Sequence, residues 1–490
     1  MKNSYLIQIL KLFSPRERSR FRDFVFSPFF NKNQKVQRLC MEILRYAPDY
    51  EDIRLEKQTM YRYIFGEGQY QDLQLNNVIS DLLQLAYRFL ANLQLEEREL
   101  LLKNFTLENL LERGHTTLAK RLGDSFAQKL EKTTEKNATY FYYEYLFHDK
   151  MVRHHLSTKM RAADVHLQAK NDSFDLYYLC NKLRMACDML SRQNTTGTLY
   201  QCHFLEEVLL HYQNNFLNCR QNPAFNIYYQ LLLLIQEKKE EQYRKLKSYI
   251  PKHLHLFPKA ELRIIYLYLQ NYCIFQINSG KSRYYRELRE LYELLLEEGI
   301  LFQNGFLQQW TYKNIVTVGI RLAEYDWTES IIHQYKSKLK ESERPNALAY
   351  NLAALYYARK QYKKALRQLH DVTFTDQAYH LGAKIIQLKS YFELNETEAL
   401  HSLLEAFKKY ILRNKGLAPY HKQANANFLR LVKKLYKLKS SRKRKTGKYI
   451  KAQVKKLNSL LAETQPIANK DWLLEKMEES FGKANVAPTE

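Results

Sequence analysis

Residues 349–372 have the sequence AYNLAALYYARKQYKKALRQLHDV, and the apolar pattern of this stretch returns 34 residues further along the chain. The corresponding pairs are Leu352 and Ile386, Ala365 and Ala399, Leu369 and Leu403, and Val372 and Ala406. Apolar and small residues that recur at this period are typical of stacked helical hairpins, because a single hairpin cannot bury its own apolar face. The stretch therefore predicts an all-α protein whose hairpins form an elongated α-solenoid.

The composition favours the same class. The 490 residues include only 13 glycines and 10 prolines, fewer than β-sandwiches, barrels or doubly wound sheets need for their turns. Tyrosine is common, at 38 residues. Its ring fills wide gaps between helices while its hydroxyl stays near water, which suits a thin array with much half-buried surface.

The chain divides into four expected segments. They are an N-terminal helical module over 1–100, an irregular helical-hairpin array over 101–300, the clear repeats over 301–438, and a basic extension with a C-terminal helix and tail over 439–490. In the first segment, Ser14-Pro15-Arg16-Glu17 predicts a helix start, because serine caps a helix, proline fits its first turn and glutamate completes a capping box.

The stretch from Ala349 to Val372 resembles a tetratricopeptide repeat. The residues that match the family pattern are Leu352, Ala353, Tyr356, Tyr362, Ala365, Leu369 and Val372. The sequence departs from the pattern at Ala349 and at Lys360, which stands at the turn glycine, and in the next repeat at Gln387 and Ser390.

The resemblance implies a right-handed superhelix whose first helices line a groove that binds a protein or peptide. Carried over by position, the groove-lining residues are Tyr350, Ala354, Tyr357, Lys384, Leu388 and Tyr391. Tyr357 and Tyr391 are one period apart, so they are expected to stack along the same wall. The layout of an N-terminal module before a helical array also resembles bacterial regulators that place a helix-turn-helix in front of a tetratricopeptide sensor.

The net charge of +25 is concentrated near the two ends of the sequence. Between Ala406 and Ala462 there are 18 lysines and arginines and no acidic residue, and residues 1–45 carry a net charge of +7. Such asymmetry indicates an acidic partner. The candidate polyanion-binding residues are Arg442, Lys443, Arg444, Lys445, Lys448, Lys451 and Lys455. Nucleic acid, an anionic membrane surface and docking of the basic helix on the end of the array remain alternatives.

No catalytic or metal-binding motif is present. The sequence lacks the phosphate-binding, dinucleotide-binding, nucleophile-elbow and zinc-protease signatures, so no enzyme activity and no cofactor are predicted. Three glutamate–histidine pairs, such as Glu144 and His148, are four residues apart, and this spacing is ordinary for contacts on one helix face. We therefore expect no metal site.

No stretch is long and apolar enough for a transmembrane helix, and the N-terminus does not have the pattern of a signal peptide. The six cysteines form no C-x-x-C pair and are expected to be reduced core thiols in the cytoplasm. The sequence thus favours a non-catalytic protein-binding scaffold. The alternative is a nucleic-acid-associated regulator, and an unrecognised enzyme comes third. The sequence predicts neither the partner nor the oligomeric state.

Overall fold

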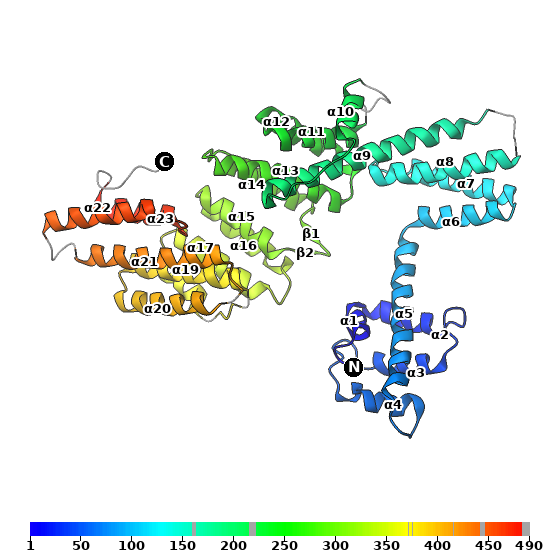
Figure 1. The fold of residues 1–490 in the computed structure, drawn as a ribbon, viewed down its shortest axis with the longest axis horizontal. Helices are drawn as coiled ribbons and strands as arrows, with labels where there is room; N and C mark the ends of the chain where they lie inside the picture. The colour runs from blue at the N-terminus through cyan, green and yellow to red at the C-terminus, as the bar shows by residue number, and fades with distance from the viewer. Residues whose placement is uncertain are drawn as a thin grey trace. The chain divides into compact units, whose positions relative to one another are not determined.

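The computed structural model describes residues 1–158, 163–214, 222–370, 372–374, 376–414, 416–441 and 446–482. These residues fold almost entirely as α-helix (Figure 1), which confirms the predicted all-α class. Regular strand within them is limited to β1 (Phe302–Gln303) and β2 (Phe306–Leu307), which pair antiparallel. Among the helices of these residues, none is long and apolar enough to cross a membrane.

The chain forms two compact units. The first comprises Met1–Glu237 with Arg244–Phe257, and the second comprises Lys238–Tyr243 with Pro258–Glu490.

The first unit begins with a group of helices that has its own core. These elements are α1 (Tyr5–Leu12), α2 (Pro15–Phe26), α3 (Gln34–Leu44), the 3-10 helix η1 (Ile53–Leu55), α4 (Lys57–Phe65) and α5 (Asp72–Glu97). The capping box predicted for α2 is confirmed, because the Ser14 hydroxyl accepts from the Glu17 N–H at 3.3 Å and the Glu17 carboxylate accepts from the Ser14 N–H at 2.7 Å. The rings of Phe13, Phe21 and Phe89 meet in the core with centroids 5.4 Å apart.

The rest of the first unit continues as packed helices. They are α6 (Glu99–Glu112), α7 (Thr116–Glu131), α8 (Ala138–Thr158), α9 (Val165–Thr196), α10 (Leu205–Gln213), α11 (Pro223–Glu237) and the 3-10 helix η3 (Ile250–Leu256). Helix α12 (Glu240–Tyr249) begins in the second unit and ends in the first. On α9 the side chains of Leu179, Leu183 and Ala186 are buried.

The second unit contains the repeats. Its helices are α13 (Lys259–Asn278), α14 (Tyr284–Glu297), α15 (Gln309–Arg321), α16 (Tyr325–Tyr335), the 3-10 helix η4 (Lys336–Lys338), α17 (Arg344–Ala358), α18 (Tyr362–His370), α19 (Gln377–Leu394), α20 (Thr397–Arg413), α21 (Pro419–Ser441), α22 (Gly447–Glu463) and α23 (Lys470–Phe481). From α13 to α22 each helix packs on the next, and α17 also packs on both α15 and α19.

Three turns of the second unit, between α15 and α16, α17 and α18, and α19 and α20, have the same backbone geometry. Ala323, Lys360 and Asn395 all adopt positive φ, at 57°, 61° and 57°, between consecutive helices. In each turn the following N–H donates to a carbonyl five residues earlier, at 3.0, 2.8 and 3.1 Å, which closes the preceding helix in the same way. Lys360 therefore adopts the left-handed conformation that glycine supplies at this position of the tetratricopeptide pattern.

The 34-residue period holds for the first helices but is wrong for the second ones. Leu352 and Ile386 are both buried, at 7% and 8% exposed. On α20, however, Ala406 is exposed, and the buried residues are Leu400, Leu404, Phe407 and Ile411. Leu400 and Leu404 lie 35 residues after Ala365 and Leu369 on α18. Moving one residue along a helix rotates the buried face by about 100°. The one-residue shift on α20 therefore turns larger side chains towards the core.

The segment predicted as a basic extension from residue 439 does not begin a separate element. Helix α21 continues to Ser441. The basic helix is α22, and its apolar residues Ile450, Val454, Leu457 and Leu461 are buried. Helices α22 and α23 share one hydrophobic core with α19, α20 and α21.

Candidate functional site

The candidate site is the surface of the second unit on which α23 lies. Trp472, Leu473 and Met477 on one face of α23 are at most 6% exposed. The Trp472 ring contacts Phe392 of α19 and Phe428 of α21, with centroid distances of 5.2 and 5.9 Å. We call the residues that receive α23 the helix-docking surface, and they are Tyr357, Lys389, Phe392, Glu393 and Phe428.

Polar contacts fix the position of α23 on this surface. The indole N–H of Trp472 donates to the Tyr357 hydroxyl at 2.7 Å, and the Lys389 ammonium donates to the Asn469 side chain at 2.7 Å. Near the other end of α23, the Lys476 ammonium forms an ion pair with Glu393 at 2.8 Å, and only 8% and 12% of these side chains are exposed.

Burial changes the charge chemistry of the site. Desolvation and the nearby Arg321 lower the pKa of Lys389 to about 8, and the Lys389 ammonium also lies 5.4 Å from the centre of the Trp472 ring. Burial alone would lower the pKa of Lys476, but its contacts with Glu393 and Glu479 raise that pKa above its ordinary value. Burial and the charge of Glu393 also raise the pKa of Tyr357. Near pH 7 the ammonium groups of Lys389 and Lys476 therefore keep most of their charge, and the Tyr357 hydroxyl stays neutral.

The residues predicted to line a groove do not form one surface. Tyr350 packs between α17 and α19, because its ring lies 5.1 Å from that of Tyr379 and a Cβ on Gly382 would approach it to 2.5 Å. Lys384 instead lines a cavity of about 200 Å³ with His380 and Phe374, and burial lowers its pKa.

Two further predictions about this groove are corrected. Leu388 is 0% exposed and belongs to the core, because its side chain points between helices rather than outward, so it cannot line an accessible groove. Tyr357 contacts Tyr362 and Trp472, whereas Tyr391 packs on the core shared by α19 to α23. Among the described residues no ring contact joins Tyr357 to Tyr391, so the expected stacking is absent.

Sequence reasoning missed Lys389, Glu393, Trp472 and Lys476. The signal was weak but present, because Trp472 is one of only three tryptophans and lies on the apolar face of a short helix. Nothing local to either segment links α23 to Tyr357, which is 115 positions away.

The basic candidates lie on α22 or outside the described residues. Arg442, Lys443, Arg444 and Lys445 lie outside the described part of the chain. Lys448, Lys451 and Lys455 are exposed, and their spacing of three and four residues places them along one side of α22. No carboxylate of the described residues forms an ion pair with any of the three.

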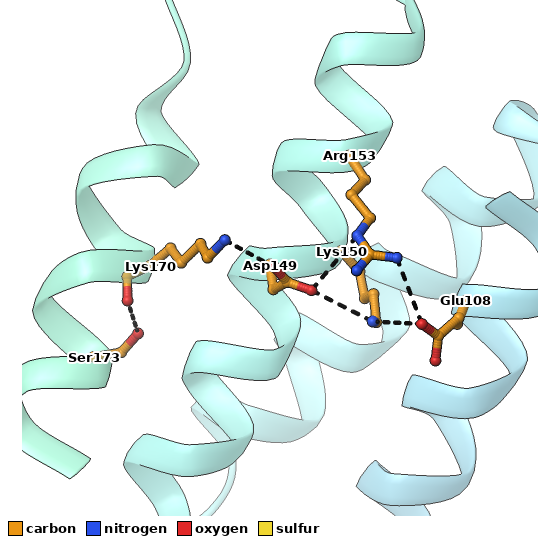
Figure 2. A network of polar contacts seen from close by, with 6 residues as sticks. All are labelled: Glu108, Asp149, Lys150, Arg153, Lys170 and Ser173. Carbon is orange, nitrogen blue, oxygen red and sulfur yellow. Dashed lines mark hydrogen bonds and ion pairs between the residues drawn. The ribbon is translucent and has the colours of Figure 1, made fainter. Parts of the chain in front are cut away.

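The first unit contains a buried polar network that no motif predicted (Figure 2). Asp149 of α8 contacts Lys170 of α9 at 2.8 Å, and Lys150 bridges Asp149 at 3.4 Å and Glu108 of α6 at 3.1 Å. Although burial would raise the pKa of Asp149, the cations around it hold that pKa below its ordinary value. Since both carboxylates are bound by cations, the network joins three helices and offers no free acid or base.

Within the described residues, no group of three or more histidine, cysteine, aspartate or glutamate side chains could hold a metal ion. Comparisons with known proteins give no further guide to the site, because no family model, no curated protein and no solved structure matches this chain.

Proposed function

We propose that this chain is a non-catalytic scaffold whose second unit, an elongated right-handed α-solenoid of tetratricopeptide type, binds an amphipathic helix of a partner protein. The repeated left-handed turns at Ala323, Lys360 and Asn395 support the solenoid. The docking of α23 supports the mode of binding, because helix-binding grooves receive apolar anchors from one face of a helix. In α23 these anchors are Trp472 and Met477, and Lys476 adds a positive charge that forms an ion pair with Glu393.

In this proposal α23 occupies the surface to which the partner helix binds. A helix tethered to its site competes at an effective concentration of about 1 mM, so a partner must bind the vacated surface tightly to replace it. The apparent affinity for the partner equals the intrinsic affinity multiplied by the fraction of molecules in which α23 is undocked. Changes that loosen α23 should therefore strengthen binding in trans.

The test uses the full-length chain and a fluorescein-labelled peptide of residues 466–482. In Lys476→Glu, four acidic side chains would meet around position 476, since Glu393, Glu475 and Glu479 already lie within 3.4 Å of the Lys476 ammonium. This variant should release α23 and bind the peptide at least about 10-fold more tightly than the wild type, as measured by fluorescence anisotropy. Lys470→Glu is the matched control, because exposed Lys470 makes the same charge change on the same helix without a partner at Glu393.

A charge swap identifies the contact. The full-length chain with Glu393→Lys should bind a peptide that carries Lys476→Glu more tightly than the natural peptide. The full-length chain with Lys476→Glu should instead bind the natural peptide more tightly. If hydrogen exchange shows that α23 is released in Lys476→Glu and the chain still binds no peptide, the surface does not accept a helix from outside and the proposal fails.

Nucleic-acid binding is the second candidate, and the exposed row of Lys448, Lys451 and Lys455 favours it. Replacing all three with glutamine should weaken binding to DNA or RNA to a similar extent for all sequences and reduce its salt dependence. Absence of binding by the wild type in 50 mM salt would remove this candidate.

Either function fits the expected cytoplasmic location, since free thiols suit a reducing compartment. Cys40, Cys180, Cys187 and Cys273 are buried and form no disulfide within the described residues.

A further inference from the structure

A cavity of about 580 Å³ lies between α21 and α22, and none of its lining residues belongs to the helix-docking surface. Its apolar lining comes from Leu438 of α21 and from Leu457 and Leu460 of α22. Along α22 the lining extends from Tyr449 to Glu463, which spans about 21 Å at the helical rise of about 1.5 Å per residue. The cavity is therefore long on its α22 side and has a partly apolar wall, and its volume falls within the range of small-molecule sites.

The cavity also carries an excess of positive charge. Lys434 and Lys437 of α21 and Lys456 of α22 line it, and all three side chains are exposed. No carboxylate within the described ranges forms an ion pair with these lysines. Glu463 is the single acidic residue of the lining, because residues 406–462 contain none. Three lysines and three leucines therefore line the same cavity, with one carboxylate among the lining residues.

We propose that this cavity binds a single-chain anionic amphipath, namely a long-chain fatty acid taken up as a monomer. The leucine side chains remove the acyl chain from water, and each buried CH₂ group contributes about 0.8 kcal/mol to the free energy of binding. The lysines bind the carboxylate through charge-assisted hydrogen bonds. The length of the cavity matches an extended chain, which a compact phosphate or a polar metabolite would leave partly empty.

The lysines of the cavity differ in position from those of the exposed row on α22. Lys456 lies on the same helix side as Tyr449, Gln453 and Leu460, whereas Lys448, Lys451 and Lys455 lie on the side turned away from the cavity. A polyanion would use the exposed row, which has no apolar lining. The two lysine sets can therefore be tested separately, and this proposal does not depend on the helix-docking surface.

The experiment titrates the full-length protein with 11-(dansylamino)undecanoic acid and follows dansyl fluorescence, with oleate as an unlabelled competitor. The wild type should bind the probe and release it to oleate. Replacing Lys434, Lys437 and Lys456 with glutamine should weaken binding at least about 10-fold. The matched control replaces Lys448, Lys451 and Lys455 with glutamine, which removes the same charge and should change binding less than about 2-fold. Circular dichroism of both variants checks that the helices are intact.

Two further arms complete the test. Leu460→Gln keeps every lysine but adds a polar group to the half-buried wall of the cavity, so it should also weaken binding. Dodecyltrimethylammonium, which has a chain and the opposite charge, should not compete. The proposal is overturned if both lysine triplets weaken binding equally, if the wild type does not bind the probe, or if the protein binds phosphatidylcholine vesicles with 20% phosphatidylglycerol but not the monomeric probe.

Discussion

The indole N–H of Trp472 donates a 2.7 Å hydrogen bond to the hydroxyl of Tyr357, and so joins two helices whose residues are 115 positions apart in the sequence. Tyr357 lies in the stretch that most resembles a tetratricopeptide repeat, and Trp472 lies in the last helix of the described chain. The bond connects the best-matched repeat to the helix that we propose as a stand-in for a partner.

The Trp472–Tyr357 hydrogen bond should contribute about 0.5–1.5 kcal/mol to the free energy of unfolding of the second unit. Trp472→Phe and Tyr357→Phe each remove the bond, so the double variant should cost less than the sum of the single ones. Urea unfolding followed by hydrogen exchange of α23 measures this coupling. A coupling energy near zero would mean that the two groups do not bond in solution.

Lys360→Gly should stabilise the second unit. A non-glycine residue in the left-handed conformation costs about 1–2 kcal/mol, and glycine avoids this cost. Glycine also has greater freedom in the unfolded chain, which offsets part of the stabilisation. Lys360 has a φ of 61°, so a net gain of about 0.5–1 kcal/mol is expected. Asn395→Gly is the control, and it should stabilise the second unit less, because asparagine tolerates the left-handed conformation. Tryptophan fluorescence reports the second unit, where Trp310, Trp327 and Trp472 all lie. Destabilisation by Lys360→Gly would contradict the turn geometry.

The polar network of the first unit should be sensitive to loss of one charge. Asp149→Asn leaves the buried Lys150 with Glu108 alone and removes the partner of Lys170, so a cost of about 3–5 kcal/mol is expected. Asp124 of α7 is exposed, so Asp124→Asn makes the same chemical change and should cost less than about 0.5 kcal/mol. Hydrogen-exchange mass spectrometry in urea measures α8 and α9 separately. Equal effects of the two substitutions would show that the network does not stabilise this unit.

Mild acid should loosen α8 and α9. The Nδ1 atoms of His148 and His166 lie 3.0 Å apart, and burial together with the charge of His166 lowers the pKa of His148 to about 4 from 6.5. Since the unfolded chain binds this proton more readily, the free energy of unfolding is highest above pH 6.5 and falls as the pH drops from 6.5 towards 4. His148→Asn should reduce this pH dependence in the same exchange measurement at pH 7.5 and 5. An unchanged dependence would mean that His148 is not responsible.

Features that depend on neighbouring residues were predictable from the sequence. The capping box at Ser14 needs only four consecutive residues, and the apolar face of α22 follows from helical spacing. The burial of Leu388 was missed, because the repeat pattern assigned a face by analogy and the larger neighbouring side chains of α20 and α21 cover it. The docking of α23 was missed. The sequence of an amphipathic helix shows which of its faces is apolar, but it does not show which surface will cover that face.

The most direct test of the proposed function is hydrogen exchange of α23 in the full-length wild-type protein, with and without the 466–482 peptide at about 1 mM, close to the effective concentration of the tethered helix. If the peptide occupies the helix-docking surface, the amides of residues 470–481 in the chain should lose protection while α17 and α19 keep theirs. If the peptide binds and the protection of α23 is unchanged, the partner helix does not replace α23 and the central claim is wrong.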